Sequence, residues 1–486
     1  MSLVFYNTLS KKKEPFKPIE SHNVGLYSCG PTVYDDAHIG NLRAYVFVDV
    51  LKRTLIEQGF EVRHVMNMTD VGHLSGDSDG GDDKMSKALK REELPLSKEN
   101  MKIVGQKYAK RFLDDLKSLS VIIPDETPFA SDHIEAMQGI IKILHDKGYV
   151  YKTSDGLYFD TEKFPDYGVL GSTCAVGQEN VSRIEKNPEK KNQADFAVWK
   201  FTQTRNKHGN MPNGTEGVGW DFEPFGNGFP GWHIECSAMS REYLGQPFDI
   251  HTGGIDHVGT HHDGEIAQSS VAFDSPLANF WLHNEHLILP EGKMAKSEGN
   301  SITLSDLKDK GVHPIAFRYY LLQTHYRSPL SFSLDAILAA HTALERLVVS
   351  IALLPKSAKE EGDSSDSDFV TSLSDALVDD LDTPKAIASI HENLRSSPNT
   401  ESIIEGLKKA DNLLGLNLLS LADNIIVHNP ETEVKELLQK RAEYKKNNNW
   451  DEADKIREKV KELGYSIVDQ GERTLLMRPL SRLEII

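Results

Sequence analysis

Hydrophobic and polar positions in the first part of the chain follow two different periods. Residues 24–29 form a short apolar run that Pro31 ends, which predicts a buried strand. Apolar side chains then recur at helical spacing from about residue 38 to residue 59, and residues 60–68 predict a second strand. A strand, a helix and a strand of these lengths form a βαβ unit, so we expect a parallel sheet.

Further along the chain, helical periodicity alternates with segments rich in Gly, Asn and Asp. We expect loops at 72–83 and 186–219, the second with one short strand near 196–199. Short strands and helices alternate between residues 220 and 300, and the chain is mostly helical after Leu304. Helices are predicted at 96–119, 132–147, 369–421 and 431–463, and hairpins at 149–160 and 465–477.

Length and composition limit the classes of protein that the chain can represent. With 486 residues and 39% hydrophobic side chains, it is too long for one compact core, so several domains are expected. It has no long apolar run and no apolar segment near its first residues, which predicts neither a membrane-spanning helix nor a secretory signal. Cys29, Cys174 and Cys236 are too few for a disulfide framework and fit a reducing cytoplasm.

The formal net charge of −18 weighs against a nucleic-acid partner, because phosphate contacts need Lys and Arg. A charge total is an average over the whole surface, however, and a local basic patch can lie on an acidic protein. The sequence does not locate such a patch.

A first candidate motif is His38-Ile39-Gly40-Asn41, at the predicted start of the first long helix. A helix N-terminus offers unpaired backbone N–H groups and a positive dipole end, both of which suit a phosphate. His38 can steady charge that develops during a transfer reaction, and Gly40 lets a ligand approach the backbone closely. A helix start with an incidental histidine explains the tetrapeptide equally well.

A second candidate motif is Lys293-Met294-Ala295-Lys296-Ser297, which lies between Gly292 and Gly299. Two lysines in a loop flanked by glycines can close over a triphosphate and stabilise the transition state of its cleavage. A solvated basic loop is the alternative interpretation, and this segment alone does not decide between the two.

Cysteine, histidine and glutamate side chains form a candidate metal set. Cys29 ends the first strand, and Cys236 ends the segment 231–236. His261 and Glu265 are four residues apart, so on a helix they share one face. Two thiolates, an imidazole and a carboxylate can bind zinc tetrahedrally. Two buried structural cysteines beside an ordinary helical His and Glu remain the alternative, because the four residues come from distant places.

Together, in this order, the two motifs resemble the paired signatures of class I aminoacyl-tRNA synthetases. Two positions depart from that pattern: Asn41 stands where a second histidine is usual, and Ala295 where a serine is usual. The resemblance implies that His38, Gly40, Asn41, Lys293, Lys296 and Ser297 bind ATP, and that His38, Lys293 and Lys296 serve catalysis.

Segments 231–239 and 248–269 resemble the cysteinyl-tRNA synthetase family in particular, although Thr252, Thr260 and Asp263-Gly264 depart from its usual residues. The resemblance implies one zinc ion per chain, held by Cys29, Cys236, His261 and Glu265. It also implies four residues near the bound cysteine: Thr69, Trp232, His251 and Asp256. Asp256 suits the substrate ammonium, and Trp232 suits a wall of the pocket. Cys174 has no role in this scheme.

The resemblance covers nearly the whole chain and implies an α/β fold with four parts. A Rossmann-type parallel-sheet catalytic domain would be split between 1–124 and 220–305, with a connective insertion at 125–219. A helical bundle would span 306–425, with an acidic loop near 358–369. A small C-terminal α+β module at 426–486 would read the anticodon.

The implied activity is that of a zinc-dependent cysteine–tRNA ligase in the cytoplasm. Its partners would be ATP with Mg²⁺, L-cysteine and tRNA(Cys), without a membrane, and the chain would be a monomer. Because zinc binds a thiolate far better than a hydroxyl, no separate editing domain is expected. The alternatives are a cysteine-activating ligase that uses an amino sugar as acceptor, a nucleotidylyltransferase, and a zinc-stabilised RNA-binding protein.

Overall fold

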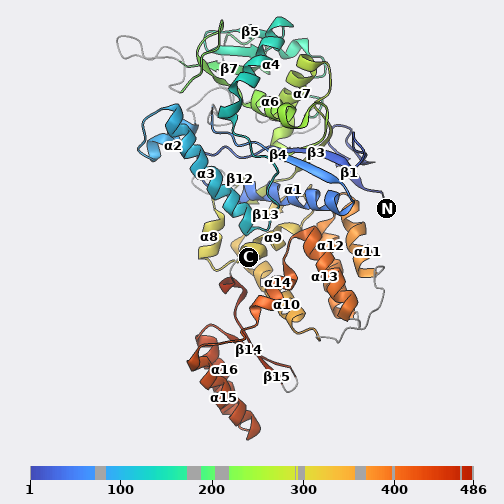
Figure 1. Ribbon diagram of the computed structural model, residues 1–486, viewed down its shortest axis with the longest axis vertical. Helices are drawn as coiled ribbons and strands as arrows, with labels where there is room; N and C mark the ends of the chain where they lie inside the picture. Colours follow the sequence, from blue (N-terminus) through green and yellow to red (C-terminus); the bar gives the residue numbers. More distant parts are fainter. Residues whose placement is uncertain are drawn as a thin grey trace.

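The computed structural model has an elongated shape, with residues 150–159 near one end of its long axis and residues 432–462 at the other (Figure 1). It describes residues 2–71, 84–171, 188–202, 218–289, 292–293, 301–355, 368–396, 400–470 and 473–483.

A sheet of four parallel strands forms the centre of the first region. The strands are β3 (Asn23–Ser28), β4 (Glu61–Met66), β9 (Phe248–Gly254) and β10 (Ala278–Asn284), in the order β10-β9-β3-β4. All three strand pairs are parallel, so the carboxyl ends of the four strands meet at one edge. The predicted βαβ unit and the parallel sheet are therefore confirmed.

Helices cover both faces of this sheet. Helix α1 (Ile39–Glu57) lies on one face, and α6 (Trp232–Leu244) and α7 (Asp263–Phe273) lie on the other (Figure 1). Strands that are covered on both faces bury consecutive side chains, which explains why residues 24–29 are a nearly continuous apolar run. The predicted α/β class is correct.

A second sheet lies beyond α6 at one end of the molecule (Figure 1). Its strands are antiparallel and lie in sequence order: β5 (Val150–Lys152), β6 (Gly156–Phe159), β7 (Phe196–Phe201) and β8 (Gly228–Pro230). The first two strands form the predicted hairpin, and β7 is the strand predicted near 196–199. Helix α4 (Ile134–Asp146) packs between this sheet and α6.

Two helices connect the central sheet to this part of the chain. Helix α3 (Lys98–Ser118) was predicted, and α2 (Lys84–Arg91) was not. The sequence of α2 places Met85, Ala88 and Leu89 on one buried side and its basic residues on the other.

The chain after residue 300 is mostly helical, as predicted. Its helices are α8 (Leu304–Asp309), α9 (Pro314–Leu322), α10 (Leu334–Ala352), α11 (Asp368–Val378), α12 (Thr383–Ser396), α13 (Thr400–Leu414) and α14 (Leu418–Ile425). The buried guanidinium of Arg318 on α9 pairs with Asp49 on α1, and also donates to the carbonyl of Leu414. One apolar core therefore runs from the parallel sheet into these helices.

The C-terminal region has a core of its own. It consists of α15 (Thr432–Lys446), α16 (Trp450–Glu462) and an antiparallel hairpin of β14 (Ser466–Gln470) and β15 (Arg473–Met477), as predicted. Five buried side chains make this separate core: Val434, Ile456, Val460, Ile467 and Leu476. The region lies at the end of the molecule opposite the second sheet (Figure 1).

Some sequence predictions fall on residues outside the described ranges. They are the loop at 72–83, residues 186–187 and 203–217 of the loop at 186–219, most of the acidic segment at 358–369, Cys174, Lys296 and Ser297. None of the described helices is long and apolar enough to cross a bilayer.

Candidate active site

A cavity of about 600 Å³ opens at the carboxyl edge of the parallel sheet. Residues at or just beyond the ends of the four strands line it: Cys29 after β3, Asn67 after β4, Asp256 after β9 and Asn284 in β10. The start of α1 and the basic side of α2 complete its walls. Open parallel sheets bind their ligands at this edge, because successive strand ends converge there.

The close approach of two strand ends shapes the floor of the cavity. The backbone N–H of Gly30 donates to Oδ1 of Asn67 at 2.8 Å, and a Cβ on Gly30 would meet the carbonyl oxygen of Asn67 at 1.6 Å. Only glycine fits there, which allows the chain after β3 to turn beside the chain after β4.

The four predicted metal ligands lie together at one end of the cavity. Their ligand atoms are all within 4.8 Å of one another. His261 ends a single π-helical turn (Val258–His262) that continues into α7, where Glu265 occupies the first turn. Nε2 of His261 lies 2.8 Å from Oε1 of Glu265, as the spacing of four residues predicted.

The acidic groups of this cluster surround the imidazole of His261, and their pKa values show which of them carry a negative charge. A hydrogen bond from Cys29 lowers the pKa of the Cys236 thiol to about 6, against the opposing effect of burial. Burial alone would raise the pKa of Glu265, but His251 and His261 lower it to about 2. The cluster therefore holds a thiolate and a carboxylate in a buried place, which favours a bound cation.

The residues present fit a zinc ion. Cys29 and Cys236 are free thiols, and Nδ1 of the buried His261 lacks a hydrogen-bond partner among the described residues, while its Nε2 faces Glu265. The ring of His261 instead stacks on Trp232, with centroids 4.2 Å apart. Buried polar atoms are nearly always satisfied, so an unsatisfied imidazole nitrogen in a cluster with two thiols and a carboxylate indicates a metal site.

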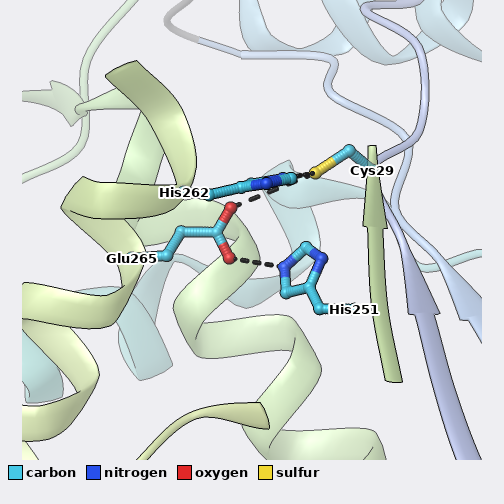
Figure 2. A group of neighbouring side chains, drawn as sticks. All are labelled: Cys29, His251, His262 and Glu265. Atoms are coloured by element: carbon cyan, nitrogen blue, oxygen red, sulfur yellow. Dashed lines mark hydrogen bonds and ion pairs between the residues drawn. The ribbon is translucent and has the colours of Figure 1, made fainter. Parts of the chain in front are cut away.

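A second group of potential ligands shares two members with the first. Figure 2 shows Cys29, His251, His262 and Glu265, whose ligand atoms also lie within 4.8 Å of one another. Nε2 of His251 lies 2.7 Å from Oε2 of Glu265, and Nε2 of His262 lies 3.3 Å from the Cys29 sulfur.

The first group suits zinc better than the second. In the second group, His262 is also held from behind by His283, and His251 stacks on Trp281. The first group adds a second thiolate, the ligand that zinc prefers.

Sequence reasoning missed the histidine network behind the metal cluster. Nδ1 of His262 lies 2.7 Å from Nε2 of His283, whose Nδ1 lies 2.8 Å from the hydroxyl of Thr8. The network thus joins Cys29 to Thr8, between the paired antiparallel strands β1 (Val4–Asn7) and β2 (Lys12–Pro15). The local density of histidines could have indicated this network, because seven of the 19 histidines in the chain lie between residues 233 and 286.

The four residues predicted to contact cysteine fall into two groups. Trp232 and Asp256 line the cavity, but Thr69 and His251 are not among the described residues that line it. The hydroxyl of Thr69 donates to Oε2 of the buried Glu235 at 2.9 Å, and His251 binds Glu265. Both side chains therefore lie behind the cavity wall.

The first motif forms the N-terminus of α1, where His38 is the N-cap. Its Nδ1 accepts a hydrogen bond from the backbone N–H of Asn41 at 3.2 Å, so the neutral ring carries its proton on Nε2. His38, Gly40 and Asn41 all line the cavity. The structure thus provides a helix N-terminus and a ring N–H donor at this wall.

The second motif is only partly described. Lys296 and Ser297 lie outside the described residues, and for Lys293 the structure describes the backbone, in strand β12 (Gly292–Lys293). β12 pairs with β11 (Leu287–Leu289), which in turn pairs with β13 (Leu330–Ser331). On the far side of the motif, the N–H of Ile39 donates to the carbonyl of Ile302 at 2.8 Å. The chain after the second motif therefore contacts the start of the first.

Arg43 connects the two motifs from inside the protein. This residue of α1 is only 3% exposed, and its guanidinium donates to the backbone carbonyls of His286, His325 and Ser328. Burial lowers the pKa of Arg43 to about 10, so it stays charged at neutral pH. The three carbonyls belong to the segments that flank β11 and β13, so Arg43 fixes this small sheet against α1.

A parallel sheet with potential metal-binding side chains at its carboxyl edge and a histidine motif at the start of α1 defines a class I aminoacyl-tRNA synthetase. Residues 15–342 match the family model of the tRNA synthetases class I (C) catalytic domain. The fold is similar to that of Mycobacterium tuberculosis methionyl-tRNA synthetase in complex with methionyl-adenylate. That comparison gives a TM-score of 0.57 at 14% identity and covers 83% of this chain and 94% of the other.

Within that class, the chain belongs to the cysteinyl-tRNA synthetase family. Residues 431–474 match the cysteinyl-tRNA ligase anticodon binding domain. The chain is 41% identical over 473 residues to the cysteine–tRNA ligase 1 of Burkholderia lata, covering 97% of this chain and 96% of the relative. It is 38% identical over 505 residues to the cysteine–tRNA ligase of Treponema denticola, covering 98% and 99%.

Proposed function

We infer that this chain is a cysteine–tRNA ligase, which activates L-cysteine with ATP and transfers the cysteinyl group to the 3′ end of tRNA(Cys). The observation that carries the inference is the buried thiol, imidazole and carboxylate cluster, which lies in the same cavity as the start of α1. A metal site for a sulfur ligand and a phosphate site are thus adjacent.

Cys29, Cys236, His261 and Glu265 are the proposed zinc ligands. When bound, zinc supplies a soft Lewis acid that attracts the thiolate of cysteine and distinguishes it from the hydroxyl of serine. Trp232 stacks on His261 and forms the adjacent wall, which excludes water and larger side chains. The half-buried carboxylate of Asp256 is proposed to bind the ammonium group of the substrate.

Thr69 and His251 act through other residues in this scheme. His251 holds one oxygen of Glu265, which leaves the other oxygen directed at His261. Thr69 holds Glu235, the residue next to Cys236 on α6. Both are therefore proposed as positioning residues, since partners of this kind orient metal ligands.

In the activation step, an oxygen of the cysteine carboxylate attacks the α-phosphorus of ATP, and pyrophosphate leaves. The backbone of Gly40 and the side chains of His38 and Asn41 are proposed to bind the phosphates, with Mg²⁺ bound to ATP. Lys293, Lys296 and Ser297 are proposed to neutralise the charge that builds up on the leaving pyrophosphate. In the transfer step, a hydroxyl of the terminal ribose of tRNA attacks the carbonyl carbon of the adenylate and releases AMP.

ATP–pyrophosphate exchange tests this function. We expect exchange with cysteine, none above background with serine, and loss of exchange after treatment with a strong zinc chelator. Restoration by added zinc separates metal loss from denaturation. Exchange that is equally rapid with serine, or that survives complete removal of zinc, would contradict the proposed recognition.

A cysteine-activating ligase with an amino-sugar acceptor would share the first step. The match of residues 431–474 to an anticodon binding domain favours tRNA as the acceptor. The two can be distinguished by incubating the enzyme-bound cysteinyl-adenylate with tRNA or with an amino sugar and measuring the cysteinyl product. We expect only tRNA to be acylated, and we expect the chain to act as a monomer.

A further inference from the structure

The basic side of α2 forms a wall of the cavity that the proposed reaction does not use. Lys84, Lys87 and Arg91 of this helix all line the cavity, and their spacing of three and four residues places them on one helical face. The fourth basic residue of α2, Lys90, is exposed and does not line it. The helix contains no acidic residue.

This charge is exceptional in an acidic protein. Residues 84–118, which span α2 and α3, contain ten lysines and arginines against five acidic residues, a net charge of +5. The whole chain carries −18. A basic surface on such a chain concentrates positive potential where a polyanion can bind.

Aromatic rings alternate with these cations. The ammonium of Lys84 lies 5.8 Å from the ring centroid of Tyr34, which also lines the cavity. The guanidinium of Arg91 lies 5.4 Å from the ring of Tyr108 and donates to its hydroxyl at 2.8 Å. Cations beside aromatic faces are typical of surfaces that bind single-stranded nucleic acid, because bases stack where phosphates are neutralised.

Contacts with the loop that precedes α1 fix α2 at the rim of the cavity. Arg91 pairs with Asp35 at 3.1 Å and donates to the backbone carbonyl of Tyr34 at 2.7 Å. Lys84 is half-buried, whereas Lys87 and Arg91 are exposed. The basic face therefore extends from the interior of the cavity to its mouth, where a polymer must cross to reach the reacting atoms.

The position of α2 suits a ligand that also contacts the C-terminal module. In Figure 1, α2, α8 and the α15–α16 pair lie on the same side of the long axis, opposite α11, α12 and α13. The C-terminal module lies at the far end of the molecule and matches an anticodon binding domain. A tRNA that contacts both ends of the molecule along this side would bring its 3′ end to α2.

We propose that Lys84, Lys87 and Arg91 bind the phosphodiester backbone of the single-stranded 3′ end of tRNA and guide the terminal adenosine into the cavity. The proposal rests on the proposed function, since it assigns the entry path of the second substrate. The triphosphate of ATP has a separate binding site, because His38 and the start of α1 offer it a helix N-terminus.

The test compares the two half-reactions in Lys84→Gln, Lys87→Gln and the double variant. The first readout is cysteine-dependent ATP–pyrophosphate exchange without tRNA. The second is single-turnover transfer of cysteine from the preformed enzyme-bound adenylate to tRNA. We expect transfer at subsaturating tRNA to fall about tenfold in each single variant, and exchange to change less than about threefold. Lys90→Gln is the matched control, because it removes the same charge from the same helix outside the cavity, and both rates should stay at the wild-type value.

Two further measurements locate the contact. Each lost phosphate contact should lower the slope of log Kd for tRNA against log salt by about 0.7, as for a single strand. A tRNA that lacks its 3′-terminal CCA should bind the wild type and the double variant equally well.

Three outcomes would overturn the proposal. A parallel fall in exchange and transfer would assign the lysines to ATP. An equal loss in Lys90→Gln would indicate only general electrostatic attraction, and a loss of affinity for truncated tRNA would assign the contact to the acceptor stem. Absence of exchange in the wild type would instead contradict the proposed function itself.

Discussion

The two ends of the cavity are built in opposite ways. At the metal end, Cys236, His261 and Glu265 are fully buried and surrounded by histidines whose hydrogen bonds fix one another. At the phosphate end, His38 is half-buried and Lys87 is exposed. A site that must tell sulfur from oxygen benefits from a dry, preorganised set of ligands, whereas a site that admits ATP and a polymer needs accessible cations. The difference indicates that a buried, preorganised cluster selects the amino acid, whereas solvent-accessible groups bind the nucleotide and the tRNA.

The largest expected effect is at the metal end. Cys236→Ser removes the thiolate that we assign to zinc, and we expect cysteine-dependent exchange to fall by roughly 10³-fold or more, together with the zinc content. Cys174→Ser makes the same exchange of atoms at the cysteine to which the proposed scheme assigns no role, and it should leave both unchanged. A Cys236→Ser protein that retains both zinc and activity would show that the contrast between the two ends is wrong.

The two groups of potential ligands can be separated by the zinc content of His261→Gln and His262→Gln. We expect His261→Gln to lose the metal, because this imidazole is a proposed zinc ligand in the group that holds both thiols. His262→Gln should retain most of it, because His262 serves Cys29 and His283. The reverse result would assign the metal to the group shown in Figure 2.

At the phosphate end, His38→Gln should lower kcat for exchange by about 10²-fold, since it removes one donor to the developing charge. The KM for cysteine should change little, because the metal cluster is untouched. His145→Gln, on the surface of α4, is the control. If His38→Gln raised the KM for cysteine as much as it lowered kcat, the two ends would not be separable.

Arg43 should show a smaller effect that depends on geometry. Arg43→Lys keeps the charge but loses the planar fork that reaches three carbonyls, so we expect exchange to fall about tenfold. The free energy of unfolding should drop by about 2–4 kcal/mol, since buried carbonyls lose their donors. Thermal unfolding measures the loss of stability, and exchange at varied ATP concentration measures the loss of activity and the KM for ATP. An unchanged KM for ATP beside a lower stability would leave Arg43 only a structural role.

The smallest effect on cysteine activation is expected in the C-terminal module, which has a separate core. Hydrogen bonds, the first from Arg441, hold the pKa of Asp469 well below its usual range. A carboxyl whose pKa is lower in the folded protein stabilises the fold at pH values above its unfolded pKa of about 3.9. This stabilisation is lost as the pH falls towards the folded pKa. Asp469→Asn should therefore speed hydrogen exchange of β14 and β15 at pH 7 and less so below pH 4, without changing ATP–pyrophosphate exchange. Asp454→Asn is the matched control.

Much of the fold could be predicted from local pattern, because β3, α1 and β4 carry their own periodicity. The pairing of His261 with Glu265 in the metal cluster could be predicted for the same reason, since the two are neighbours on one helical face. The burial of Arg43 was not, because an arginine in a helix normally points to water and its three acceptors lie more than 200 residues away.

Other features of the site depend on contacts that no local pattern encodes. Thr69 and His251 were expected beside the substrate, but their partners Glu235 and Glu265 come from other elements. Helix α2 directly follows a segment rich in Gly and Asp, so the short helix was not predicted from the sequence. Tertiary packing decides which side chains reach the cavity, and the sequence reveals it only where near neighbours in the chain are also neighbours in space.

The central claim is that a metal ion held by Cys29, Cys236, His261 and Glu265 recognises the sulfur of cysteine. The absorption spectrum of the cobalt-substituted chain tests it most directly, because thiolate ligands give cobalt(II) intense charge-transfer bands. We predict such bands in the free protein and an increase when cysteine is added, with no increase for serine. A spectrum that cysteine leaves unchanged, in protein that still activates cysteine, would contradict the account.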